Sequence, residues 1–84
     1  MIYSLKIKGS AVKDIERLPA ADRRRVVAAI DGLKEHPQAG TLLKGKFTGL
    51  RRIRVGRFRV IYEVQESVLL VLVLRVGHRR DVYR

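Results

Sequence analysis

The sequence predicts a small single α+β domain, with a strand, two helices and three further strands in chain order. The sheet is expected to be mostly antiparallel, with both helices packed on one face. Three observations predict this architecture: apolar residues alternate with polar ones at the N-terminus, recur at helical spacing in the next segment, and return to strand patterns in the last third. No shift in amino-acid composition divides the 84-residue chain into parts, so residues 1–84 are expected to form one domain.

The first strand is predicted over residues 2–8, where every second residue is apolar. Gly9 interrupts this alternation, and Ser10 is placed to cap a short helix that ends before Pro19. The apolar face of the strand holds Tyr3, Leu5 and Ile7, and that of the helix holds Ala11, Val12, Ile15 and Leu18.

A second helix is predicted to begin between residues 20 and 22 and to run to about His36, before Pro37. Arg23, Arg24 and Arg25 lie opposite its apolar stripe and are typical of a solvated helix face, with contact to phosphates as the alternative. The apolar stripe consists of Val26, Val27, Ile30 and Leu33.

Residues 37–49 contain three glycines and a proline, and therefore indicate an irregular loop that Leu42 and Leu43 hold to the core. Strands over 50–55 and 57–64 follow as a hairpin about Gly56. After the polar residues 65–67, the continuous apolar run over 68–76 is typical of a central strand covered on both faces. Residues 77–84 are expected to leave the sheet.

The net charge of +11 is concentrated in the C-terminal half, because the residues after Leu43 include 11 basic and only 3 acidic ones. Such a field favours a polyanionic partner: a nucleic acid, an anionic membrane surface or an acidic protein. The chain has no cysteine and only two histidines, so neither a metal site nor a cofactor is expected. The longest apolar run falls far short of the roughly 20 residues that span a bilayer, which favours a cytoplasmic protein without membrane contact.

Arginines alternate with apolar residues in the first hairpin strand. Arg52 and Arg54 share one face about 7 Å apart, and Ile53 and Val55 share the other with Arg51. If the apolar face packs under the helices, the two arginines project from the uncovered face and form a phosphate site. A merely solvated sheet face is the alternative interpretation, although such dense like charge is unfavourable without a ligand. Glu63, in the next strand, is expected to pair with an arginine.

Two segments carry a family resemblance: "PQAGTLLKGKFTGLRRIRVGRFRVIYEV" and the ending "RVGHRRDVYR". Both resemble RelE-type toxins of bacterial and archaeal toxin–antitoxin pairs, and the resemblance covers nearly the whole chain. ParE-type toxins share the sequence motif of the hairpin, whereas the C-terminal motif is more specific to RelE-type toxins. The resemblance implies a RelE-like fold and an endoribonuclease that cuts mRNA in the ribosomal A site. It implies attack by a ribose 2′-OH on the adjacent phosphate, without a metal.

The resemblance also assigns the site residues by motif position. Arg59 and Arg79 are expected to stabilise the transition state, and Tyr83 to stack on a base, to hydrogen-bond the 2′-OH, or only to pack the C-terminus. The predicted catalytic residues are Arg54, Arg59, Arg79 and Tyr83, and the predicted RNA- or phosphate-binding residues are Lys44, Lys46, Arg51, Arg52, Arg57 and Arg80.

The general base is left open because well-known family members carry lysines where this chain has Arg54. A guanidinium stays protonated, with a pKa above about 12, and cannot readily accept the proton. His78 and Tyr83 are the alternatives within the chain, and a ribosomal or solvent group is the third.

The expected partners are a cognate RelB-like antitoxin with an acidic or amphipathic segment, the ribosome and mRNA. Operator DNA is expected to be bound only indirectly, through the antitoxin complex. Two other functions remain open: a ParE-like inhibitor that binds DNA gyrase without nuclease activity, and a plain nucleic-acid-binding domain.

Overall fold

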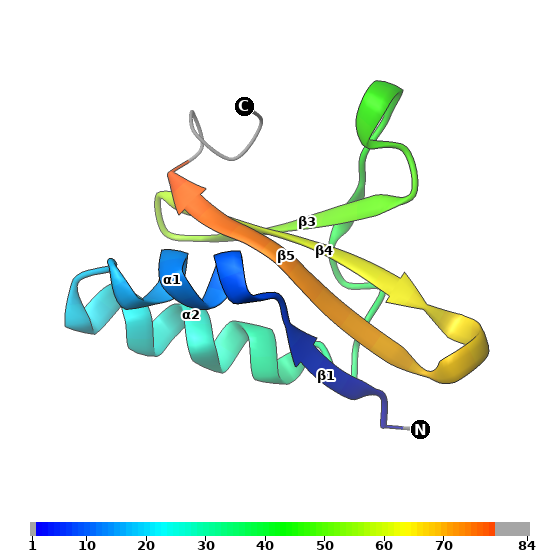
Figure 1. Cartoon of the computed structure of the whole chain (residues 1–84), viewed down its shortest axis with the longest axis horizontal. Helices are drawn as coiled ribbons and strands as arrows, with labels where there is room; N and C mark the ends of the chain where they lie inside the picture. Colours follow the sequence, from blue (N-terminus) through cyan, green and yellow to red (C-terminus); the bar gives the residue numbers. More distant parts are fainter. Residues whose placement is uncertain (1, 79–84) are drawn as a thin grey trace.

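The computed structural model describes residues 2–78, which form a five-stranded sheet with two helices on one side (Figure 1). The sheet order is β1-β5-β4-β3-β2. This confirms the predicted α+β architecture. The elements are β1 (Ser4–Ile7), α1 (Gly9–Glu16), α2 (Ala20–Gly32), β2 (Thr41–Leu42), the 3₁₀ turn η1 (Gly45–Phe47), β3 (Leu50–Val55), β4 (Phe58–Gln65), the 3₁₀ turn η2 (Glu66–Val68) and β5 (Leu70–His78).

The sheet is mixed rather than wholly antiparallel. Strands β2, β3, β4 and β5 pair antiparallel in that order, whereas β1 pairs parallel with β5, with Ser4 opposite Leu70 and Ile7 opposite Val73. The two-residue β2 lies inside the predicted loop. It is too short to show alternation in the sequence.

The hydrophobic core lies between the helices and the sheet. Val12 and Val27 were expected in the helix stripes, but they are 41% and 49% exposed. The reason is the 100° between successive helical residues: Val26 and Ile30 face the sheet, which turns Val27 outward. The buried core residues are Ala11, Ile15, Leu18, Val26, Ile30, Leu33, Val60, Tyr62, Val71, Val73 and Val76.

The start of α1 and the end of α2 differ from the predictions. Lys8 is the N-cap of α1, and Ser10 lies within the helix, where its hydroxyl donates to the carbonyl of Leu74 at 3.4 Å. Helix α2 ends at Gly32 instead of about His36. Residues 33–35 form turns before Pro37, since a residue that precedes proline disfavours the helical conformation.

The hairpin prediction is confirmed, with a two-residue turn at Gly56 and Arg57 and with β4 beginning at Phe58. Gly56 has a φ of 61°, a backbone conformation that glycine adopts without steric cost at the first central position of such turns. Strand β5 is central, as predicted, but its second face is only half covered: Val71 and Val73 are buried on one side, and the neighbouring leucines are half-buried on the other.

A polar contact, which we call the Tyr62 clasp, holds the loop before β2 to the sheet. The Tyr62 hydroxyl donates to the Pro37 carbonyl at 2.8 Å and accepts from the Gly40 amide at 2.9 Å. Arg51 donates to the Gly40 carbonyl at 2.9 Å. Burial raises the pKa of Tyr62 above its usual 10.0, and the Gly40 hydrogen bond and Arg51 partly oppose this. Leu42, predicted to hold the loop, is 55% exposed.

Candidate nucleic-acid interface

The two faces of the sheet differ in their side chains. In antiparallel strands, residues directly opposite one another lie on the same face. Ile53, Val60 and Val76 form one such row and pack into the core under the helices. The rows on either side of it therefore point away from the helices, onto what we call the open face. The predicted packing of Ile53 and Val55 against the core is confirmed.

Two rows on the open face carry arginines. In the first, Arg54 lies opposite Arg59, and Arg59 lies opposite Gly77, which has no side chain. In the second, about 7 Å along the strands, Ile61 stands between Arg52 and Arg75. Ile61 is 3% exposed although it lies outside the helix-side cluster, so its side chain is covered where it stands between the two arginines. The arginine face is Arg52, Arg54, Arg59 and Arg75.

A β-bulge in β5 decides on which face Arg75 lies. Tyr62 pairs with Val73 and Ile61 pairs with Arg75, so Leu74 has no partner in β4. Without the extra residue, alternation from Val73 would direct Arg75 toward the helices. The bulge therefore transfers Arg75 to the open face. Alternation read from the sequence alone does not reveal such a one-residue shift.

The charge of the molecule is unevenly distributed between its layers. Residues 9–33, which include both helices, contain five basic and four acidic residues. Residues 41–78 contain eight basic and two acidic residues. The ion pairs recorded within residues 2–78 join Arg25 to Asp22, Lys34 to Asp31 and Arg75 to Asp14.

Arg54 is exposed on β3, and none of the ion pairs recorded within residues 2–78 includes it. Glu63 accepts from the side-chain amide of Gln65 at 2.7 Å, and its pairing with an arginine, which is not among the ion pairs recorded within residues 2–78, stays a prediction.

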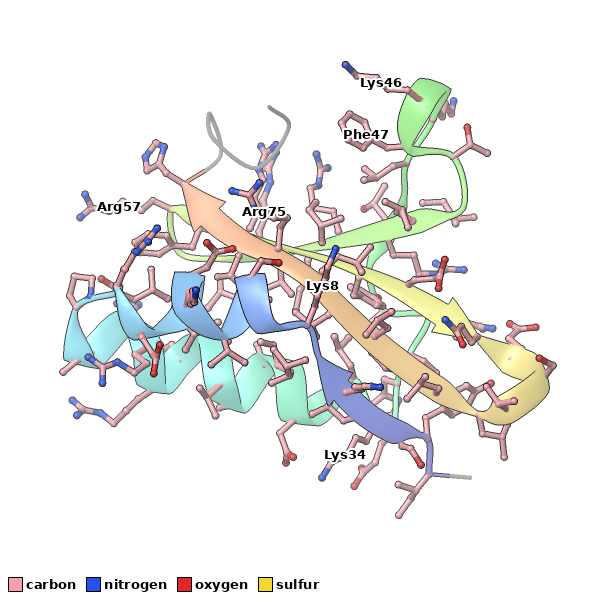
Figure 2. All side chains as sticks on the ribbon, viewed as in Figure 1. Lys8, Lys34, Lys46, Phe47, Arg57 and Arg75 are labelled. Atoms are coloured by element: carbon pink, nitrogen blue, oxygen red, sulfur yellow. The ribbon has the colours of Figure 1, made fainter. Side chains whose placement is uncertain are left out.

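Three other predicted RNA contacts surround the arginine face without joining it. Arg57 lies in the hairpin turn, and Lys44 and Lys46 lie at the η1 turn. Figure 2 shows Lys46 and Arg57 well apart, Lys46 at the top of the view and Arg57 at the left, with η1 on the side of the sheet away from the helices. Phe47, which the sequence analysis did not single out, is half-buried on the same side, with the Lys46 ammonium 5.6 Å from its ring centroid. Its signal in the sequence is an aromatic residue between polar neighbours in a glycine-rich loop.

Two predicted site residues lie on the helix side of the sheet. Arg51 belongs to the Tyr62 clasp, where it donates to carbonyls of the preceding loop. His78 lies opposite Phe58, with ring centroids 6.4 Å apart at an interplanar angle of 85°, and Phe58 packs against the core. The structure therefore does not bring Arg51 or His78 to the arginine face. Arg79, Arg80 and Tyr83 lie outside the described residues.

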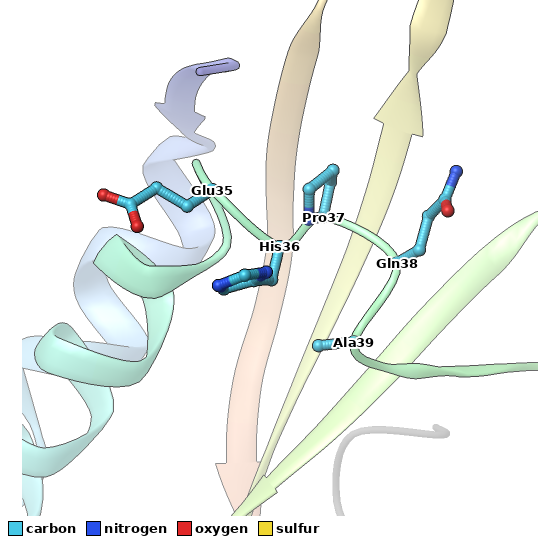
Figure 3. A pocket seen from close by; sticks show the side chains of 5 residues that line it. All are labelled: Glu35, His36, Pro37, Gln38 and Ala39. Atoms are coloured by element: carbon cyan, nitrogen blue, oxygen red, sulfur yellow. The ribbon is translucent and has the colours of Figure 1, made fainter. Parts of the chain in front are cut away.

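Two shallow hollows border the loop that precedes β2. One is lined by residues 35–39, and Figure 3 shows the side chains of Glu35 and Gln38 pointing apart, so they do not form a joint site. The other is lined by Ala39, Thr41, Arg52, Ile53 and Arg54. It adjoins the arginine face where β2, which pairs only with Arg51 and Arg52, leaves the edge of β3 open. A polyanion chain on the arginine face can continue into this hollow.

Residues 2–78 contain no group of three histidine, cysteine or acidic side chains that could hold a metal ion. None of the described helices is long and apolar enough to cross a bilayer.

Comparison with known proteins agrees with these observations. A family model described as the ParE toxin of type II toxin–antitoxin systems matches residues 5–83. Toxin RelG of Mycobacterium tuberculosis is 30% identical over 90 residues, covering 100% of this chain and 99% of that protein. Toxin RelE of the same organism is 27% identical over 84 residues, with coverages of 98% and 87%.

Solved structures share the fold over most of both chains. A chain of the toxin–antitoxin complex RelBE2 from Mycobacterium tuberculosis matches with a TM-score of 0.86 at 28% identity, covering 94% of this chain and 100% of that chain. A chain of the archaeal RelE–RelB complex from Pyrococcus horikoshii matches with a TM-score of 0.80 at 32% identity, with coverages of 98% and 100%. The chain therefore belongs to the RelE/ParE family and is a toxin of a type II toxin–antitoxin system.

Proposed function

We propose that this toxin is a ribosome-dependent endoribonuclease that binds mRNA on the arginine face and cleaves it there. The observation that carries the proposal is the direct pairing of Arg54 with Arg59 on the open face. Like charges directly opposite one another in a sheet are destabilising. A phosphate between two guanidiniums removes that repulsion and accepts hydrogen bonds from both.

The chemistry that this arrangement supports is attack within the RNA backbone. The ribose 2′-oxygen forms a bond to the adjacent phosphorus while the bond to the 5′-oxygen breaks, which leaves a 2′,3′-cyclic phosphate and a 5′-hydroxyl. Negative charge accumulates on the non-bridging oxygens in the transition state. Arg54 and Arg59 are placed to stabilise that charge, with Arg52 on a neighbouring phosphate. Removing one such donor typically lowers kcat by about 10²–10³.

The two proton transfers need groups other than the arginines of the sheet, because guanidinium does not release its proton near neutral pH. His78 points to the helix side beside Phe58, which argues against it as the base. We assign the acceptor of the 2′-OH proton to Tyr83 or to a ribosomal or solvent group, the donor of a proton to the leaving 5′-oxygen to a ribosomal or solvent group, and a second contact to the reacting phosphate to Arg79. This assignment explains why cleavage would depend on the ribosome.

The partner that keeps the toxin inactive is proposed to be a RelB-like antitoxin. Structures similar to this chain are complexes of RelE-type toxins with RelB antitoxins. An acidic or amphipathic antitoxin segment would neutralise part of the charge between residues 41 and 78 and add apolar burial to a domain with a net charge of +11. Operator DNA would then be contacted through the antitoxin.

A reconstituted translation reaction tests the proposal. Wild-type toxin should produce new mRNA 5′ ends at A-site codons, mapped by primer extension, and Arg59→Ala should lower the rate by at least about a hundredfold. Arg24→Ala, the same change on the exposed outer surface of α2, is the matched control and should cut like the wild type. Equal cutting of ribosome-free RNA would show that the A-site mechanism is wrong.

A second function, inhibition of DNA gyrase by binding, is favoured by two observations. The matching family model is that of ParE toxins, and the chain has arginine rather than lysine in β3. The order of events after induction in cells distinguishes the two functions. Arrested translation with intact DNA supports the nuclease, whereas DNA breaks with intact mRNA support gyrase inhibition.

A further inference from the structure

Helix α1 replaces a strand along part of the edge of β5. Strand β1 pairs with β5 only over residues 70–73, and the last main-chain bond between the two segments runs from the Lys8 amide to the Val73 carbonyl at 2.9 Å. The chain then turns into α1, which lies beside the second half of β5 (Figure 1). The edge groups of β5 beyond Val73 are therefore bound by side chains of α1 instead of by a strand.

Two polar side chains of α1 make these contacts. The Ser10 hydroxyl donates to the Leu74 carbonyl at 3.4 Å, and Asp14 Oδ2 accepts from the Val76 amide at 3.0 Å. Ser10 and Asp14 are four residues apart, a rise of about 6 Å along a helix. Leu74 and Val76 are two residues apart, about 6.6 Å along a strand. The spacing of the helix face therefore matches that of the strand edge.

Asp14 contacts the segment that follows the bulge at Leu74. Besides the Val76 amide, its Oδ2 accepts from Arg75 Nε at 3.3 Å. The Asp14 side chain is 14% exposed, so water competes only weakly for these bonds. Arg75 and Val76 are the first two residues after the bulge, and their faces depend on it.

We propose that Asp14 is a positioning residue of the RNA site. It holds the shifted register of β5, which keeps Arg75 on the open face and places Gly77 beside Arg59. Loss of the carboxylate leaves the Val76 amide without its acceptor at the strand edge and releases Arg75 from its ion pair. The end of β5 then moves relative to β4, and with it the geometry of the first arginine row. The inference rests on the proposed nuclease function and deepens it.

The test compares Asp14→Ala, Asp14→Asn and Asp22→Ala in single-turnover mRNA cleavage with saturating ribosomes. Asp14→Ala should lower the rate about tenfold, the effect of losing a hydrogen bond to a charged group. Asparagine keeps an oxygen acceptor for the Val76 amide, so Asp14→Asn should recover to within about threefold of the wild type. The partner of Asp22 recorded within residues 2–78 is the exposed Arg25 on α2, and Asp22→Ala is the matched control with an unchanged rate.

Amide hydrogen exchange supplies a readout that does not depend on catalysis. Exchange at Val76 should accelerate at least about tenfold in Asp14→Ala, with the amides of Tyr62 and Val64 unchanged, because these β4 residues pair with the part of β5 that precedes the bulge. Asp14→Asn keeps this measurement possible if the alanine variant does not fold. A general loss of stability would instead accelerate exchange at β4 and Val76 alike, and would overturn the positioning role.

The outcomes separate this inference from the proposed function. If the wild type cuts mRNA and Asp14→Ala cuts equally fast, the positioning role is wrong while the nuclease stands. If the wild type does not cut mRNA, the proposed function is wrong, and Val76 exchange still decides whether Asp14 holds the register.

Discussion

Replacing Gly40 by alanine should destabilise the domain strongly, because the Tyr62 clasp leaves no room for a methyl group. A Cβ at this position would lie 2.5 Å from the Tyr62 hydroxyl oxygen and 2.8 Å from the Arg52 carbonyl oxygen. The hydroxyl would have to retreat by about 0.9 Å to reach the 3.4 Å at which ordinary contact begins. Its present hydrogen bonds to Gly40 and Pro37, at 2.9 and 2.8 Å, do not survive such a shift.

The expected cost has two parts. Overpacking of a buried site costs about 1–3 kcal/mol, and each lost hydrogen bond costs about 1 kcal/mol. A total of about 3–5 kcal/mol corresponds to a fall in Tm of roughly 12–40 °C for a domain of this size. The loss should appear in urea unfolding followed by circular dichroism, at fixed salt because the chain carries a net charge of +11.

Gly32→Ala is the matched control, since a Cβ there meets nothing within 4 Å and the residue ends α2. The same substitution should stabilise by up to about 1 kcal/mol there, because alanine favours the helix. In a Tyr62→Phe background, Gly40→Ala should cost less, because the nearest atom has been removed. An unchanged cost in that background, or a Gly40→Ala protein as stable as the wild type, would refute the reasoning.

Three further predictions concern the same strands. Burial raises the pKa of Tyr62, so the stability contributed by its protonated form is fully present below pH 10 and is lost as pH rises through the folded pKa. The difference in unfolding free energy between wild type and Tyr62→Phe, measured by urea unfolding, should therefore narrow above about pH 10. Arg54→Gln should reduce the slope of log K against log salt for single-stranded RNA by about 0.7, and an unchanged slope would mean that Arg54 contacts no phosphate. Arg51→Gln should leave that slope unchanged but lower the free energy of unfolding by about 1 kcal/mol, since Arg51 binds loop carbonyls on the helix side.

Local patterns predicted most of the fold because the local signals agree with the tertiary structure. Alternation in residues 50–55 correctly placed Arg52 and Arg54 on one face of the strand and Ile53 and Val55 on the other. Pleating alone decides this within one regular strand. The hairpin at Gly56 follows from the conformation that glycine allows. Two arginines of the candidate site were therefore accessible from the sequence.

The remaining features depend on contacts between distant segments. The bulge at Leu74 arises from the pairing of β4 with β5, so the face of Arg75 and the position of His78 could not be read from alternation. Ser10 resembles a helix cap in the sequence, but β5 supplies a competing acceptor for its hydroxyl. The parallel pairing of β1 with β5 joins the two ends of the described chain, and no local pattern specifies a strand's direction.

The unequal charge of the two layers has a consequence for how the toxin meets its target. The helix layer is close to neutral, with five basic and four acidic residues between positions 9 and 33, while the strands carry the positive excess. The molecule therefore has a dipole moment directed from the helices to the sheet. In the field of a polyanion this dipole turns the molecule during diffusion, so that most encounters begin with the correct side. Association should consequently be fast at low ionic strength and slow steeply as salt is added, while substitutions on the outer surface of α2 leave the rate of encounter nearly unchanged.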